Sequence, residues 1–285
     1  MTEIAEEIAQ VRFTVESARA RRQSIGFVPT MGALHAGHAR LIERCREEAR
    51  FTVVSLFVNP TQFGPNEDFT SYPRTWDEDL CVASAAGADL LFRPSVEAMY
   101  PSGRLSTYVE PGSLSTVLEG RSRPGHFRGV ATVVLKLFQI VQPDFAYFGE
   151  KDYQQLLVIR RIVDDLNVPV AVRSVPTVRE PDGLAMSSRN RYLSPAERQA
   201  ALVLSRALGA ARDVVLRGEH DANRIRQTLA ETVKYEQLAE LDYAEVADAG
   251  SLEPLVEIET GRRAVALLAV RIGGTRLIDN AILME

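Results

Sequence analysis

Two histidines, His35 and His38, stand three residues apart beside two glycines in the segment PTMGALHAGH, residues 29–38. An apolar run at residues 25–28 precedes them and predicts a buried strand, which should end at Pro29 because proline cannot donate a sheet hydrogen bond. Beyond the glycines, apolar residues recur at helical spacing. The sequence therefore predicts a strand, a glycine loop and a helix, in that order.

A junction of this kind is suited to binding an anion. The first backbone N–H groups of a helix lack helical partners and lie at the positive end of the macrodipole, and Gly32 and Gly37 would let a ligand approach the main chain. The spacing also fits the opening of a P-loop, but His38 and Ala39 stand where lysine and serine or threonine should follow. What remains is a pair of imidazoles, each able to donate a hydrogen bond to one bound group. For an isolated H-x-G-H, a helix cap and a solvated surface histidine would be the simpler interpretation.

The complete decapeptide, placed directly after an apolar strand, reverses that preference. PTMGALHAGH resembles the signature of the pantothenate synthetase family, which belongs to the HIGH-motif nucleotidyltransferase superfamily together with the class I aminoacyl-tRNA synthetases. Other segments resemble the same family in the same order, namely NPTQFGPNEDF (59–69), DFTSYPRTW (68–76), FGEKDYQQL (148–156) and MSSR (186–189), the last being similar to the superfamily's KMSKS-type loop. The resemblance covers residues 25–193, with no departure at a functional position.

Polar residues also follow two other predicted strands. Gln62 comes after residues 51–58, which are nearly all apolar, as in a strand covered on both faces of a parallel sheet. Open sheets of this type bind ligands beyond the carboxyl ends of their strands. Lys151 follows a strand predicted at 144–148 and lies at the start of a helix. A cation is unfavourable at a helix N-terminus unless an anion lies between the cation and the helix. Each segment alone could be a surface turn, but the resemblance favours function.

The segment MSSR precedes a helix that Ser194 should cap and Pro195 should begin. Two hydroxyl groups and a guanidinium in one loop suit a triphosphate, because arginine offers a planar fork of donors and serine a short one. An exposed turn is the alternative, and the resemblance again favours function.

The pattern of elements predicts an α/β fold, a Rossmann-like doubly wound parallel sheet, followed by a smaller C-terminal α+β domain. Strands are predicted at residues 25–28, 51–58, 89–92, 144–148 and 168–172, with a short helix over 17–22 capped by Thr14 and longer helices over 37–50 and 129–142. The catalytic domain is expected to span residues 1–177. Helices at 196–217 and 222–235 and strands at 242–246, 264–271 and 275–283 then predict a lid domain, residues 178–285, that carries the MSSR loop.

Composition limits the classes of function. Lys and Arg number 33 against 38 Asp and Glu, for a net charge of −5, which argues against a nucleic-acid partner. The absence of a signal-like segment or a long apolar run predicts a cytoplasmic protein without a membrane partner. Cys45 and Cys81 lack metal-ligand spacing and are expected to be small buried apolar groups in a reducing compartment.

The resemblance implies ATP-dependent condensation of (R)-pantoate with β-alanine to pantothenate through a pantoyl-adenylate, with release of pyrophosphate and AMP, in a homodimer that uses Mg²⁺. His38, His35 and Lys151 would be catalytic, and Gln62 and Gln155 would hold pantoate. Asp152 would contact the ribose or help to hold Mg²⁺, and the metal ligands are otherwise open. The implied nucleotide site comprises Met31, Gly32, Ala33, Leu34, His35, Ala36, Gly37, His38, Gly149, Glu150, Lys151, Asp152, Val178, Met186, Ser187, Ser188 and Arg189.

Two other classes of function stay open. Another HIGH-motif adenylyltransferase, or a fragment of a tRNA synthetase, would share H-x-G-H, although the latter should carry a basic anticodon-binding part. A non-catalytic adenine-nucleotide sensor could keep the glycine loop, but it would have no reason to keep Lys151, MSSR and both glutamines. Tyr72 and His126 are given no role, and His126 is equally well explained as an ordinary loop residue.

Overall fold

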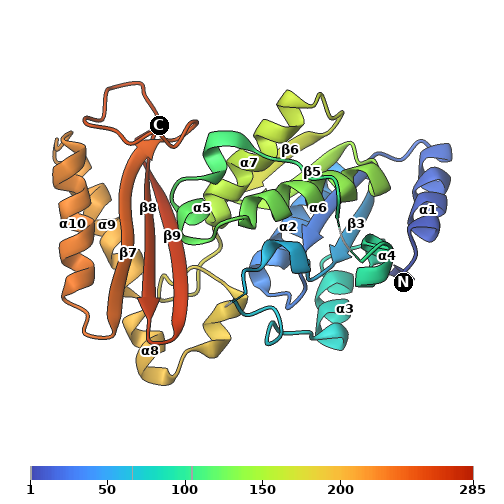
Figure 1. Ribbon diagram of the computed structural model, residues 1–285, viewed down its shortest axis with the longest axis horizontal. Coiled ribbons are helices and arrows are strands. Elements are labelled where there is room, and N and C mark those ends of the chain that lie inside the picture. Colours follow the sequence, from blue (N-terminus) through green and yellow to red (C-terminus); the bar gives the residue numbers. More distant parts are fainter. Residues whose placement is uncertain (1, 66, 104, 285) are drawn as a thin grey trace. The chain divides into compact units, whose positions relative to one another are not determined.

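The computed structural model describes residues 2–65, 67–103 and 105–284, which form two compact units (Figure 1). The first unit contains residues 2–150 and 154–176, and the second contains residues 151–153 and 177–284. The chain therefore enters the second unit for three residues between two segments of the first.

The first unit is built on a six-stranded parallel sheet. Its strands are β1 (Glu3–Ala5), β2 (Ile25–Thr30), β3 (Phe51–Leu56), β4 (Leu90–Phe92), β5 (Phe145–Gly149) and β6 (Ala171–Val175), in the order β1-β4-β3-β2-β5-β6. The order runs outward from β2 through β3 and β4 in one direction and through β5 and β6 in the other. Ligands of doubly wound sheets bind beyond the carboxyl ends of the strands at such a reversal, here between β2 and β5.

Helices cover both faces of this sheet. The helices α1 (Ile8–Ala20), α6 (His126–Val141) and α7 (Tyr153–Asp165) share one apolar core with Phe27 of β2, whereas α2 (Ala36–Glu48) and α3 (Trp76–Ala85) share another with Val28. Successive strand residues face opposite sides, so a sheet with two cores needs apolar residues at every position. This confirms the predicted α/β fold. Shorter pieces complete the unit: α4 (Val96–Met99), α5 (Glu119–Ser122) and the 3₁₀ turns η1 (Pro60–Gln62) and η2 (Gly112–Ser115).

The second unit has the predicted α+β character. It contains the 3₁₀ turns η3 (Glu150–Asp152, of which Glu150 belongs to the first unit) and η4 (Ser188–Tyr192), and the helices α8 (Pro195–Ala200), α9 (Val203–Leu216) and α10 (Ala222–Lys234). Its antiparallel sheet has the order β7 (Ala239–Asp248), β8 (Ala264–Ile272) and β9 (Thr275–Met284). Ser194 caps α8 and Pro195 begins it, as predicted. Among the described residues of both units, no helix has the length and apolarity needed to span a membrane.

Several predicted boundaries are wrong. Strand β2 continues through Pro29 to Thr30, because Pro29 lies beyond the residues of β2 that pair with β5, where its missing N–H is tolerated. Helix α1 begins at Ile8, since Glu7 and Gln10 form a capping box in place of the predicted cap at Thr14. The helix predicted at 196–217 is two helices, and β6 begins three residues after its predicted start.

The expectation of two buried cysteines is correct for Cys45 and wrong for Cys81, which is exposed.

Candidate active site

The loop after β2 is held by a buried carboxylate that the sequence analysis missed. Asp79 of α3 is only 3% exposed and accepts hydrogen bonds from the backbone N–H groups of Ala33 (3.0 Å) and Leu34 (2.7 Å). Thr75 donates to the same carboxylate at 3.1 Å. Ala33 has a φ of +50°, a left-handed conformation that costs free energy for a residue with a Cβ and needs support from its surroundings. Asp79 supplies that support from 46 residues further along the chain.

The two histidines form the cap of α2. The backbone N–H of Gly37 donates to Nδ1 of His35 at 3.1 Å, and that of His35 donates to Nδ1 of His38 at 3.3 Å. The two rings lie 4.1 Å apart between centroids. Because each Nδ1 accepts a hydrogen bond, the proton of each neutral ring lies on Nε2, which is then a donor. A capping role and a phosphate-binding role are thus compatible for these histidines.

The backbone N–H groups of the loop have partners within the protein. The N–H groups of Gly32, Ala33, Leu34, His35 and Gly37 all donate to side chains of the protein itself. The sequence predicts that such groups receive an anion. In the structure they fix the shape of the loop.

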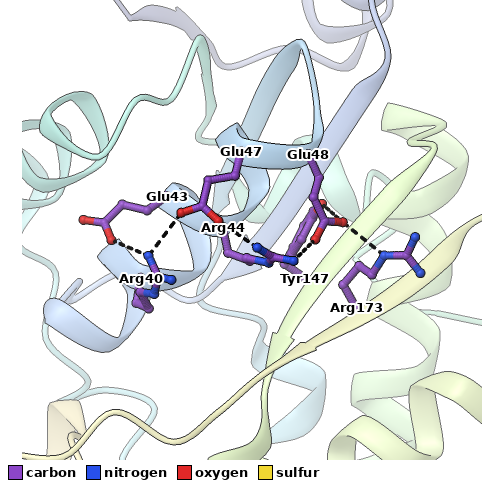
Figure 2. Close-up of polar contacts among 7 residues, drawn as sticks. All are labelled: Arg40, Glu43, Arg44, Glu47, Glu48, Tyr147 and Arg173. Carbon is purple, nitrogen blue, oxygen red and sulfur yellow. Dashed lines mark hydrogen bonds and ion pairs between the residues drawn. The ribbon is translucent and has the colours of Figure 1, made fainter.

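The far end of α2 is tied to the sheet, which fixes the direction of the helix (Figure 2). Glu48 accepts hydrogen bonds from the hydroxyl of Tyr147 on β5 (3.0 Å) and from Nε of Arg173 on β6 (3.1 Å), and it pairs with Arg44 one turn earlier (2.6 Å). Burial and the hydrogen bond to Glu48 raise the pKa of Tyr147, so this phenol stays a donor. These contacts anchor the C-terminal end of α2 and thereby help to fix the direction of the helix, whose N-terminus carries the two histidines.

Gln62 is the last residue of η1, in the connection that follows β3, and lies within a buried amide network. Its side chain is 7% exposed, its Oε1 accepts from Nδ2 of Asn59 (3.1 Å), and its Nε2 lies 3.1 Å from Sδ of Met31. Asn59 in turn accepts a hydrogen bond from the Tyr100 hydroxyl at 2.7 Å. The structure thus brings Gln62 to the first residue of the glycine loop. Asn59 was not predicted, although the Asn-Pro step after a buried strand is a signal for a turn.

The backbone of Gln62 is held from α6. Nδ1 of His126 lies 2.8 Å from the Gln62 carbonyl, to which it donates, and Arg123 lies 3.1 Å from Nε2. Burial, aided by the charge of Arg123, lowers the pKa of His126 to about 4. Gly129 permits this approach, because a Cβ there would lie 2.4 Å from the carbonyl oxygen of Thr61. His126 is therefore a buried neutral donor, not a loop residue.

Strand β5 is the parallel neighbour of β2, with Gly26 paired to Phe145 and Phe27 to Ala146. The carboxyl ends of the two strands therefore point to the same edge of the sheet. The first unit therefore brings the glycine loop and the end of β5 to one edge of the sheet, as the switch point requires. Glu150 follows and is partly buried.

The two glutamines at the start of α7 differ in their surroundings. Gln154 is 3% exposed, and its amide donates to the carbonyls of Leu114 (2.7 Å) and Val117 (2.9 Å), so it serves the packing of the unit. Gln155, the predicted pantoate ligand, is only partly buried. Its role stays a prediction.

The second unit carries the remaining predicted residues. The side chain of Lys151 is 19% exposed and lies 3.4 Å from a carboxylate oxygen of Asp152. Val178 accepts a hydrogen bond from the backbone N–H of Met186 at 2.9 Å, which closes a short hairpin. Ser187 caps η4 and accepts from the N–H of Arg189, while Ser188 begins that turn. The MSSR segment is thus an ordered turn with defined hydrogen bonds.

Comparisons with known proteins give the family. A family model described as pantoate-beta-alanine ligase matches residues 3–282. The pantothenate synthetase of Pelotomaculum thermopropionicum is 54% identical over 280 residues, which cover 98% of each chain. The crystal structure of pantothenate synthetase from Thermus thermophilus has a TM-score of 0.92 at 47% identity over the whole of both chains. A pantoate-beta-alanine ligase from Francisella tularensis, solved with βγ-ATP and β-alanine, has a TM-score of 0.80 at 36% identity, covering 99% of this chain and 98% of that one.

The chain belongs to the pantoate-β-alanine ligase family. It is accordingly a ligase that joins pantoate to β-alanine, with a nucleotide as co-substrate. The predictions of family, fold class and enzyme class are thereby confirmed.

The contact of Asp79 with the loop predicts a loss of stability in Asp79→Asn. The substitution keeps the volume but turns an amide NH₂ toward one of two buried N–H groups, so the free energy of unfolding should fall by about 2 kcal/mol in urea denaturation. Asp77→Asn, in the exposed part of the same helical turn, is the control and should change it by less than about 0.5 kcal/mol. Equal effects of the two substitutions would show that Asp79 does not hold the loop.

The buried His126 predicts a pH-dependent contribution to stability. Its folded pKa of about 4 lies below the usual 6.5, so between these values the unfolded state binds more protons and stability rises with pH. This contribution is complete above about pH 6.5 and is lost as the pH falls toward 4, to a total of about 3 kcal/mol. His126→Asn should therefore lose less stability than the wild type between pH 7 and 4.5. Identical pH profiles of unfolding free energy would contradict the prediction.

Proposed function

We propose that this ligase activates (R)-pantoate with ATP to a pantoyl-adenylate and then transfers the pantoyl group to β-alanine. The observation that carries the proposal is the meeting of the H-x-G-H loop with Gln62 at the carboxyl edge of the sheet, where β2 and β5 mark the switch point. The Francisella ligase complex with βγ-ATP and β-alanine supports the choice of substrates.

The first step needs charge neutralisation and alignment. A carboxylate oxygen of pantoate attacks the α-phosphorus of ATP, the P–O bond to pyrophosphate breaks, and negative charge develops on the departing group. His35 and His38 would donate from Nε2 to the phosphates, and His38 would also protonate or stabilise the pyrophosphate. Lys151, with Ser187, Ser188 and Arg189 of the second unit, would bind the β- and γ-phosphates.

The remaining contacts orient the substrates. Gln62 and Gln155 would bind the hydroxyl and carboxylate groups of pantoate, and the held amide of Gln62 suits that role because its orientation is preset. Met31, Gly149 and Val178 would border the nucleotide through their backbones. In the second step the amine of β-alanine attacks the acyl carbon, AMP leaves, and the nitrogen loses a proton to give the amide.

Mg²⁺ is proposed to accompany ATP. Among the residues that the structure describes, no three His, Cys, Asp or Glu side chains are grouped so as to hold a metal ion. Mg²⁺ needs no such group when one carboxylate and the substrate phosphates bind it. Asp152, whose side chain is 49% exposed beside Lys151, fits that single-carboxylate role, and the ion would offset phosphate charge.

A homodimer in the cytoplasm is also proposed. The homodimer rests on the resemblance to the family. The cytoplasmic location is supported by the two free thiols, Cys45 and Cys81, because unpaired cysteines are usual in a reducing compartment.

Lys151→Ala should lower turnover by about 10²- to 10³-fold, because a donor aimed at developing negative charge is lost. Steady-state kinetics with all three substrates would measure the effect. The control is Lys234→Ala, an exposed lysine of α10 in the same unit, which should retain wild-type turnover. Near-native turnover of folded Lys151→Ala would remove this residue from the catalytic set.

Pyrophosphate exchange tests the adenylate itself. With ATP, Mg²⁺ and pantoate but no β-alanine, labelled pyrophosphate should enter ATP, because the first step is reversible without the amine. Leaving out pantoate should abolish the exchange, and adding β-alanine should yield AMP. Exchange without pantoate, or ADP as the product, would overturn the mechanism. The same assay distinguishes the alternative functions. A tRNA synthetase would need an amino acid for pyrophosphate exchange, and a nucleotide sensor would show no exchange.

A further inference from the structure

Two adjacent polar residues lie buried in the middle of β9, where an apolar sequence would suffice for packing. Leu277 and Ala281 belong to the apolar core of the second unit, and Asp279 lies between them on the same face of the strand with its side chain 1% exposed. Asn280 is 8% exposed on the other face. Replacing a buried ion pair by apolar residues is often neutral or stabilising, so folding alone does not account for Asp279.

Asn280 contacts the backbone of the proposed catalytic lysine. Its Nδ2 donates to the carbonyl oxygen of Lys151 at 2.9 Å, a bond between residues 129 positions apart. A lysine side chain is long and flexible, so the position of its ammonium group depends on a fixed backbone at its base. The bond to Asn280 fixes that base on a strand of the sheet.

Asp279 contacts the hairpin that carries the MSSR loop. Its oxygens accept a bidentate pair of hydrogen bonds from Arg179, at 2.7 and 2.9 Å, and Arg179 also donates to the carbonyl of Gly183 at 3.1 Å. Arg179 forms an antiparallel bridge with Ala185, directly before Met186. A bidentate guanidinium–carboxylate pair restricts orientation as well as distance. It therefore sets the direction in which the hairpin presents the loop.

From these contacts we infer that Asp279 and Asn280 are positioning residues for the ligase reaction, one for the phosphate loop Met186–Arg189 and the other for Lys151. The inference rests on the proposed roles of those groups in binding the ATP phosphates. It gives the C-terminal strand a function beyond packing, because the two groups are held by neighbouring residues of one rigid element. A shift of either group by about 1 Å would cost up to about 100-fold in rate.

A double-mutant cycle tests the action of Asn280 through Lys151. Asn280→Ala should lower pantoate-dependent pyrophosphate exchange by about 10- to 100-fold in the wild type, and by less than about 2-fold in Lys151→Ala, where no ammonium remains to be positioned. Asn280→Asp, which keeps the volume but loses the donor, should match Asn280→Ala. Equal fold losses in both backgrounds would show a merely structural role and overturn the inference. The control is Thr275→Val, at a buried polar residue at the start of β9, which should keep the wild-type rate of pyrophosphate exchange.

Amide hydrogen exchange gives a readout that does not depend on activity. Without substrates, Asn280→Asp should speed exchange in residues 150–155, and Asp279→Asn should speed it in residues 178–189, while Thr275→Val changes neither. Unchanged protection in both variants would overturn the inference. If the wild type showed no pantoate-dependent exchange of pyrophosphate, the proposed function would fail, and hydrogen exchange would still decide whether β9 holds these two segments.

Discussion

The hydrogen bonds from the N–H groups of Ala33 and Leu34 to the buried carboxylate of Asp79 are the constraint on which the candidate site depends. They bind the loop to α3 and hold Ala33 at positive φ, and the loop in turn sets where α2 begins. The amides of Ala33 and Leu34 precede α2 and are satisfied by the Asp79 carboxylate, whereas those of His35 and Gly37, at the start of the helix, are satisfied by the histidine rings. Both histidine side chains are already oriented by backbone hydrogen bonds, as the proposed donation to phosphate requires.

Preset orientation is the common property of the predicted ligands. Gln62 is held by Asn59 through its amide and by His126 through its carbonyl, and Lys151 is held through its own carbonyl by Asn280. An adenylate-forming reaction asks little covalent chemistry of the protein, so accurate placement of donors is the main contribution left. With the proposed site, each supporting residue would act on the rate through a neighbour, without touching a reacting atom.

Local patterns were enough to predict the elements that carry the site. The unbroken apolar run of β3 revealed a strand covered on both faces, and the cap at Ser194 began α8 as expected. The capping box of Glu7 and Gln10 that begins α1 is also a local signal, and it was missed. Other misses arise from longer-range effects. Pro29 is tolerated within β2 because of where β5 stops pairing, and Asp79 meets a loop some 45 residues away, so no local spacing marks it. The resemblance supplied the predicted ligands, which stay predictions, whereas the residues that support them became visible only in three dimensions.

Burial of the supporting groups carries a cost in stability that the fold must offset elsewhere. A buried amide or carboxylate is tolerated only when its hydrogen bonds are satisfied, and a partly satisfied network is worse than an apolar one. Asn59, Asp79 and Asp279 each have several partners, and each lies directly beside a predicted ligand or its loop. An apolar residue at any of these positions could preserve packing but could not orient an amide, a glycine loop or a hairpin. Their chemistry is therefore better explained by the need for a preorganised site than by the need for a stable fold.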